Sequence, residues 1–175
     1  LHIMGLLSDG GVHSHIDHFK AILKLAKKEN VQNVYLHTYL DGRDVPPQSS
    51  LDYFKDLEGF MAEEGIGVIA TVHGRYYAMD RDKRGERTGL SYDLLTAFKG
   101  PQYASAEAGV KANYDAGIHD EFVVPFGIDE KGTIDDHDAV IFMNFRPDRA
   151  IQMSVALTNP EKSIVPHAKK FNDLA

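Results

Sequence analysis

The sequence predicts an α/β fold, a three-layer α-β-α domain with a mainly parallel sheet and helices on both of its faces. Up to residue 74, short β-rich apolar segments alternate with longer segments whose apolar residues recur at helical spacing. Each of the first three predicted strands also ends in a loop rich in polar residues. This alternation favours parallel strands joined by crossover helices, with function at the carboxyl ends of the strands. A length of 175 residues corresponds to one domain with an adequate core.

The first strand and helix are bounded by clear turn signals. Residues 2–8, HIMGLLS, are apolar and run into DGG, which predicts a buried strand followed by a turn. Apolar residues at helical spacing predict a helix over 14–30, with Ser14 or Asp17 at its start. Residues 33–40 are β-rich and precede DGRDVPP, whose prolines stop a second strand.

The next helix and strand follow the same pattern. Residues 50–64 predict a helix that Ser49 or Ser50 can cap and that Gly65 ends. Residues 67–74, GVIATVHG, predict the third strand.

The second half of the chain is less regular. Proline in EFVVPFGI predicts an edge strand at 121–128, whereas DAVIFMNF predicts a buried strand at 138–145. Helices are expected over 90–99, over 104–116, and from Pro147 or Asp148 to Leu157.

Composition limits the classes of function. A formal net charge of -7 argues against a general nucleic-acid partner, and the longest apolar runs are far shorter than the ~20 residues that span a bilayer. The absence of cysteine excludes disulfides, thiolate metal sites and a cysteine nucleophile. We therefore expect a soluble, cytoplasmic protein with neither a nucleic-acid nor a membrane partner.

The ends of the sequence suggest a piece of something longer. The chain opens on Leu1 and is already strand-like within a few residues. We expect residues 1–175 to be a single domain cut from a two-domain enzyme. The polar segment 160–175 is then a candidate linker toward the missing domain.

Arginine is concentrated near the predicted strand ends. The segment 74–87, GRYYAMDRDKRGER, holds four arginines and a lysine, but three interleaved acidic residues also fit a solvated, salt-bridged helix face. Four arginines come just after predicted strands: Arg43, Arg75, Arg146 and Arg149. Because guanidinium groups match phosphate and carboxylate groups in pairs of hydrogen bonds, the pattern predicts a site for a small phosphorylated acid.

Histidine and aspartate near these arginines have several interpretations. His13 and His15 have a spacing that some metal-dependent hydrolases use, but His13 can instead donate a hydrogen bond to phosphate, and His15 and His18 fit ordinary helix positions. Asp44 can be a structural partner of Arg43 or a base for a substrate hydroxyl. Asp9 can cap the first helix.

Familiar catalytic motifs do not occur in the sequence. It has no P-loop, no GxGxxG and no GxSxG, so nucleotide binding and α/β-hydrolase chemistry have no support. No nucleophile is evident, which favours binding over reaction.

Four motifs, in order, carry a resemblance to a known family: LLSDGGVHSH, LDGRDVPP, GRYYAMDRDKR and NFRPDR. They resemble the cofactor-independent (2,3-bisphosphoglycerate-independent) phosphoglycerate mutases, and specifically their phosphotransferase domain, which is inserted into an alkaline-phosphatase-like metal domain. The resemblance implies interconversion of 3-phosphoglycerate and 2-phosphoglycerate in glycolysis. It also implies that a serine of the metal domain, beside two manganese ions, takes the phosphoryl group while this domain holds the glycerate.

The resemblance also implies roles for individual residues. His13 would contact the phosphoryl group or a substrate oxygen, and Arg43 and Asp44 would bind the glycerate, with Asp44 as the acid/base at its hydroxyls. Four further arginines would hold the carboxylate and the phosphate: Arg75, Arg81, Arg146 and Arg149.

Two departures from the family pattern stand out. This chain has DKRGERT where the family usually has DKRWERV, and Gly85 and Gly89 predict a loosened segment. The serine nucleophile and the metal ligands of the partner domain are missing, so we expect the isolated chain to bind no metal and to be inactive. The alternatives are a stand-alone binding module for phosphorylated acids and a metal-dependent hydrolase built on His13 and His15.

Overall fold

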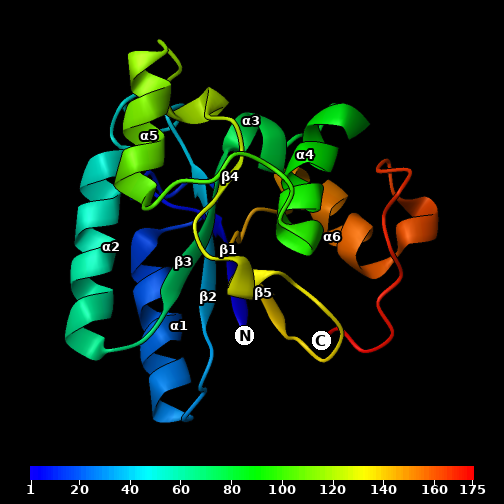
Figure 1. Ribbon diagram of the computed structural model, residues 1–175, viewed down its shortest axis with the longest axis horizontal. Coiled ribbons are helices and arrows are strands. Elements are labelled where there is room, and N and C mark those ends of the chain that lie inside the picture. The colour runs from blue at the N-terminus through cyan, green and yellow to red at the C-terminus, as the bar shows by residue number, and fades with distance from the viewer.

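A five-stranded sheet forms the centre of the molecule in the computed structural model, which describes residues 1–175 (Figure 1). The order of the strands is β4-β3-β2-β1-β5, and all neighbouring pairs are parallel except β3 and β4. The strands are β1 (His2–Leu6), β2 (Tyr35–Leu40), β3 (Val68–Gly74), β4 (Phe126–Gly127) and β5 (Val140–Phe142).

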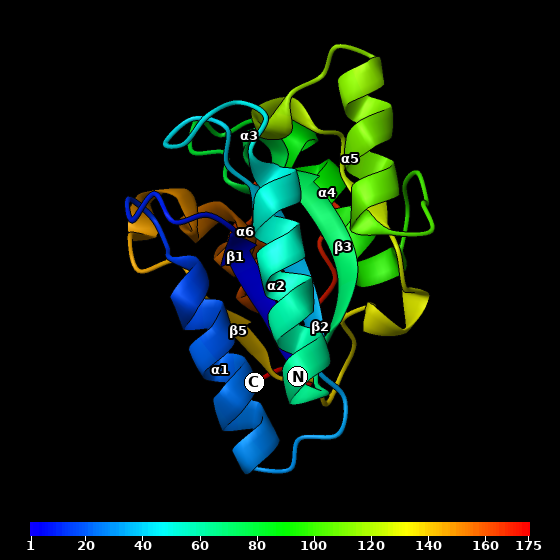
Figure 2. The same ribbon diagram turned by 90° about the vertical axis from the view of Figure 1, so that its left-hand side faces the viewer.

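Helices cover both faces of this sheet, as the alternating pattern predicts (Figures 1 and 2). One face carries α1 (Ile16–Lys28), α2 (Ser50–Glu64) and α5 (Ala106–Asp115). The other carries α3 (Arg75–Ala78), α4 (Gly85–Ala97) and α6 (Ile151–Thr158). Each face buries its own hydrophobic cluster, so the three-layer α-β-α prediction is confirmed. Short 3₁₀ helices occupy Asp120–Phe122, Glu130–Gly132, Pro147–Arg149 and Pro160–Lys162.

The start of α1 differs from the prediction. His15 is the N-cap, and its Nδ1 accepts a hydrogen bond from the backbone N–H of Asp17 at 3.2 Å. Ser14 instead donates its hydroxyl to the carbonyl oxygen of Leu6, at the end of β1. The prediction that Ser14 or Asp17 caps α1 was therefore wrong. The hydroxyl of Ser14 is used in the hydrogen bond to the free carbonyl at the end of β1.

A distant residue caps α2. The side chain of Asp120 accepts from the backbone N–H groups of Ser49 at 2.9 Å and Ser50 at 3.0 Å, so it satisfies two of the unpaired amides at the helix start. The hydroxyl of Ser49 donates to Pro46 instead. Gly65 ends the helix with φ of 67°, as predicted.

The second half of the chain departs most from the prediction. The helix expected at 90–99 begins earlier, at Gly85, and continues unbroken through Gly89, so the loosening expected at these two glycines is absent. The backbone of Ile164 fills the space where a side chain at Gly85 would stand. Without a side chain, Gly85 allows this close approach.

The two later strands are both at the edges of the sheet. The edge position predicted for 121–128 is correct, but a 3₁₀ turn and Pro125 leave only Phe126–Gly127 paired, antiparallel to β3. β5 is short and half-buried rather than the buried strand expected at 138–145, because it has a partner on one side only. The last predicted helix is split into the 3₁₀ turn Pro147–Arg149 and α6.

Residues 160–175 pack against the domain. Val165 is fully buried, and the backbone N–H of Lys169 donates to the hydroxyl of Tyr92 at 2.8 Å. At the end of the chain, Val140 donates its N–H to the carbonyl of Ala175 at 2.8 Å. No helix in the structure combines the length and apolarity needed to cross a membrane.

A row of buried polar side chains crosses three strands. His2 contacts Asp138 at 3.1 Å and His37 at 2.9 Å, through its two ring nitrogens. Thr71 lies between His37 and His73, with 2.7 Å to a ring nitrogen of each. This row, the histidine row, joins β1, β2 and β3 in the interior of the sheet.

Candidate anion-binding site

Charged side chains gather at the carboxyl ends of the parallel strands. The chain moves outward from β1 to β2 and β3, then returns to place β5 on the other side of β1. In open α/β sheets a crevice forms outside the carboxyl ends at such a reversal. The loops after β1, β2, β3 and β5 meet there and contain all four family motifs.

Arg75 joins the ends of β2 and β3. It is the first residue after β3, and its Nη1 donates to Asp41 Oδ1 and to Asp44 Oδ2, each at 2.6 Å. Arg75 and Asp41 are buried, whereas the side chain of Asp44 is 17% exposed and so remains open to a ligand. The geometry fixes a guanidinium and a reachable carboxylate side by side.

Asp41 is held in its charged form. Burial raises the pKa of its carboxyl, but hydrogen bonds from the backbone of Asp44 and the hydroxyl of Ser8, with the charge of Arg75, outweigh burial and lower the pKa. Ser8 donates at 2.7 Å, and the N–H of Asp44 at 2.9 Å. Asp41 thereby ties the loop after β1 to the loop after β2.

Asp148 brings a second pair of arginines together. Its Oδ2 accepts from Arg81 Nη1 at 2.8 Å and from Arg146 Nη2 at 3.1 Å. Its Oδ1 lies 3.9 Å from Nδ1 of His13, which is 2% exposed. Burial lowers the pKa of His13, and the charges of Arg75 and Arg146 lower it further, so His13 is neutral at physiological pH.

Arg149 differs from the other four arginines selected from the sequence because it forms no ion pair. Its Nη1 donates to the carbonyl of Met79 at 3.1 Å. Burial lowers the pKa of Arg149, as do the charges of Arg81, Arg75 and Arg43, which shows that four guanidinium groups share one neighbourhood. Arg149 is thus the arginine best placed to receive an incoming anion.

A cavity of about 220 Å³ opens among these groups. Arg43, Arg75 and Arg149 line it, and Arg43 pairs with Glu121 at 3.2 Å. Its wall also includes Arg87, whose guanidinium lies 4.0 Å from the centre of the Tyr76 ring.

Several residues of this neighbourhood were not predicted as site residues from the sequence. Asp41 and Asp148 lie within the quoted motifs DGRD and RPDR, so their position beside selected arginines was the available signal. The other residues of the cavity that were not selected are Tyr76, Asp80, Asp82, Arg87, Glu121 and Phe122. Of these, Glu121 comes from a distant segment and had no signal in the sequence.

All seven residues selected from the sequence lie around the same strand ends: His13, Arg43, Asp44, Arg75, Arg81, Arg146 and Arg149. The structure does not bring His13 and His15 together as a metal pair, since His13 is buried near Asp148 and His15 caps α1. No three His, Asp or Glu side chains are grouped so that they could hold a metal ion.

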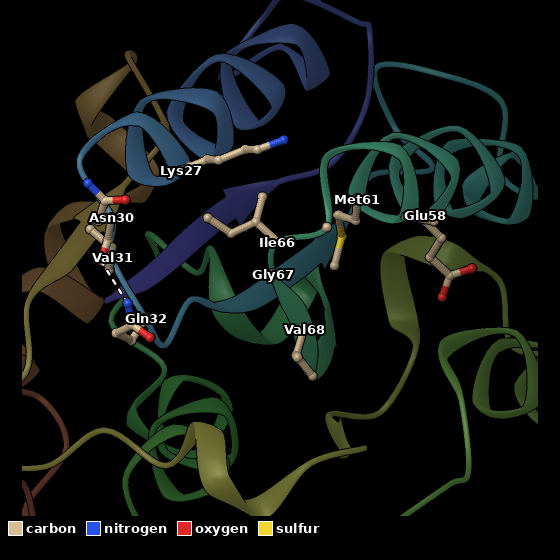
Figure 3. Close-up of a pocket in the computed structure, with 11 residues that line it drawn as sticks. Lys27, Asn30, Val31, Gln32, Glu58, Met61, Ile66, Gly67 and Val68 are labelled. Carbon is tan, nitrogen blue, oxygen red and sulfur yellow. Dashed lines mark hydrogen bonds between the residues drawn. The ribbon is translucent and has the colours of Figure 1, made fainter.

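A larger hollow of about 660 Å³ lies at the opposite end of the sheet, where α1 and α2 end and β3 begins (Figure 3). Lys27 and Glu58 are its only charged lining residues, and Lys27 pairs with Glu64 at 3.0 Å. Without convergent charges this hollow is a weaker candidate for a ligand site, despite its size.

The fold and the site define a doubly wound α/β domain that presents clustered arginines at the carboxyl ends of its strands. Residues 1–174 match the family described as BPG-independent PGAM N-terminus (iPGM_N), and the chain belongs to this family.

Individual relatives agree with the family match. The chain is 56% identical over 160 residues to a 2,3-bisphosphoglycerate-independent phosphoglycerate mutase of Staphylococcus aureus (strain MRSA252), covering 91% of this chain and 32% of the relative. It is 54% identical over 165 residues to the enzyme of that name from Clostridioides difficile (strain 630), covering 92% and 32%. The chain thus spans about a third of the length of these relatives.

A solved structure shows the same fold. Phosphoglycerate mutase of Leishmania mexicana, crystallised at low cobalt concentration, superposes with a TM-score of 0.88 at 31% sequence identity. The match covers 99% of this chain and 34% of the other.

Proposed function

We propose that this chain is the substrate-binding, phosphotransferase part of a phosphoglycerate mutase that interconverts 3-phosphoglycerate and 2-phosphoglycerate in glycolysis. The main support is the convergence of Arg43, Arg75, Arg81, Arg146 and Arg149 on one set of strand ends. A three-carbon acid with two anionic groups requires separate cationic contacts for its carboxylate and its phosphate, and several guanidinium groups can supply them.

The proposed roles follow from position and charge. Arg149, which forms no ion pair, and the exposed Arg43 bind the incoming anion. Asp44 is partly exposed beside Arg75 and exchanges a proton with a glycerate hydroxyl, while neutral His13 contacts the phosphoryl group or a substrate oxygen. Fixed contacts of this kind retain the glycerate between the two half-reactions.

The remaining chemistry belongs to a second domain. We propose that a serine there, beside two manganese ions, accepts and returns the phosphoryl group, and that residues 160–175 lead toward that domain. The isolated chain therefore binds substrate without turnover. We place the whole enzyme in the cytoplasm, where glycolysis takes place.

Calorimetric titration of the 175-residue chain with 3-phosphoglycerate tests the binding proposal. We expect saturable binding that Arg149→Ala weakens and that Arg84→Ala, an exposed arginine without an ion pair, leaves unchanged. Equal loss in both variants would indicate non-specific charge attraction and contradict the proposed site.

An enolase-coupled assay tests the division of labour. The full-length parent should be active and the purified chain inactive. Turnover by the chain alone, free of contaminating mutase, would show that a nucleophile lies within these residues.

A further inference from the structure

The carboxylate of Asp148 lies among the arginines of the site, and its contacts differ from those of the buried Asp41. Its carboxylate is 31% exposed and contacts two arginines, Arg81 and Arg146, that come from different loops. Arg75 also contacts two carboxylates, and one of them, the buried Asp41, is anchored by hydrogen bonds from the backbone and from Ser8. Asp148 receives no such anchoring hydrogen bond, so the two arginines alone hold its carboxylate.

One half of the Asp148 carboxylate is poorly satisfied. Oδ1 is buried and has no hydrogen-bond partner apart from its ion-pair contact with Arg146 Nε at 2.9 Å. His13 Nδ1, 3.9 Å from Oδ1, is likewise buried without a partner. An unsatisfied buried polar group costs about 1–3 kcal/mol, so this arrangement is less stable than a fully bonded one.

We propose that Asp148 is an internal counter-anion, which occupies the place of the substrate anion on Arg81 and Arg146 and is displaced when a dianionic group binds. The proposal rests on the proposed function, since the incoming anion is taken to be a group of a phosphoglycerate. No covalent step is involved, only an exchange of one anionic partner for another.

The exchange sets a minimum negative charge that a ligand needs in order to displace Asp148. A single carboxylate has the same charge and acceptor geometry as Asp148, so it gains little by replacing Asp148. A phosphoryl group carries about two charges and three acceptor oxygens, and it can satisfy Arg81, Arg146 and His13 together. Asp148 therefore favours phosphorylated acids over simple carboxylic acids at this position.

Sulfate is a suitable probe because it is a tetrahedral dianion with constant charge near neutral pH. We expect Asp148→Asn to bind sulfate about tenfold more tightly than the wild-type chain, since the amide no longer competes for the arginines. Asp115→Asn, at an exposed position at the end of α5, makes the same change in net charge and should leave sulfate affinity unchanged. Unchanged, weaker or absent sulfate binding by Asp148→Asn would overturn the proposal.

A measurement on the wild-type chain does not depend on the folding of a variant. Burial raises the pKa of the Asp148 carboxyl, but the hydrogen bond from Arg81 and the charge of Arg146 outweigh burial and hold the pKa below its ordinary value. Arg149 is a further charged group near Asp148, and Lys83 and Lys162 line a cavity together with Asp148. Carbon-13 NMR titration of Asp148 should show a higher pKa in saturating sulfate, and an unchanged or lower pKa would contradict displacement.

The two proposals can fail separately. If sulfate behaves as expected but 3-phosphoglycerate binds no tighter than sulfate, the proposed function is wrong and the displacement of Asp148 stands. If 3-phosphoglycerate binds tightly and Asp148→Asn changes neither its affinity nor that of sulfate, the displacement is wrong and the proposed function stands.

Discussion

Arg75 Nη1 lies 2.6 Å from Asp41 Oδ1, and both side chains are almost completely buried, at 3% and 1% exposure. The pair joins the loop after β2 to the residue that follows β3. It therefore supports the shape of the site as well as its charge.

Removing the guanidinium of Arg75 should destabilise the fold. Arg75→Met leaves the Asp41 carboxylate buried without its cation, and loss of one partner of a buried pair costs about 3–5 kcal/mol. Urea unfolding would measure the change. Arg43→Met removes a pair whose arginine is 56% exposed and should cost less than about 1 kcal/mol. Similar losses in the two variants would refute the structural role of Arg75.

Stability should fall in mild acid because of the histidine row. Burial lowers the pKa of His73 to about 3 and lowers that of His37 well below its ordinary value of 6.5. Below pH 6.5 the unfolded chain binds protons that the folded chain does not, so stability present above 6.5 is lost as pH falls toward the folded pKa. Between pH 7 and pH 5 the loss is about 2 kcal/mol for each such histidine.

Urea unfolding at several pH values would measure this slope. His137 contributes with the opposite sign, since a hydrogen bond from its ring to Asp173 raises its pKa and its contribution is lost as pH rises. His119→Gln, at an exposed position outside the histidine row, should leave the slope unchanged. Constant stability from pH 7 to pH 5 would show that the row is open to protons in the folded state.

Arg149→Ala in the full-length parent should weaken substrate binding. Each hydrogen bond from a charged group contributes about 1.5–3 kcal/mol, so an increase of about 10- to 100-fold in KM is expected. Arg146→Ala should act in the same direction, though less strongly if Asp148 is released toward Arg81. Steady-state kinetics with unchanged KM and turnover in both variants would remove these arginines from the site.

Two helical glycines should respond to alanine in opposite directions. Nothing lies near the position of a side chain at Gly59 in α2, so Gly59→Ala should stabilise the chain by about 1 kcal/mol. A side chain at Gly109 in α5 would meet the ring of Phe126, and Gly109→Ala should destabilise by about 1–3 kcal/mol. Thermal unfolding of the two variants would compare them, and a stabilised Gly109→Ala would contradict the packing of α5 on β4.

The first half of the fold could be predicted because its signals are local. Strands β1, β2 and β3 are apolar or β-rich segments followed by turn residues, and Gly65 ends α2 where the sequence indicates. The cap of α2 could not be predicted, since Asp120 is 70 positions from Ser50 in the sequence. The short β4 depends on pairing with β3, which local propensity does not encode.

The candidate site shows the same division. Arg75 and Arg149 could be selected because each follows a strand end, and the topology brings such ends together. The partners of the arginines could not be assigned, because whether Asp148 faces Arg81 depends on two loops whose conformations come from packing. The sequence therefore predicted the arginines of the site but not the carboxylates with which they pair.

The histidine row also allows the direction of hydrogen bonds inside the sheet to be measured by NMR spectroscopy. With the proton of a neutral His2 on Nε2, which lies 3.1 Å from the Asp138 carboxylate, Nδ1 of His2 accepts from His37, and the same direction of donation continues through Thr71 to His73. All three imidazoles then share the Nε2–H tautomer, with the lone pair of His73 Nδ1 left without a donor. One nitrogen-15 resonance from any ring thus reports the orientation of the whole row.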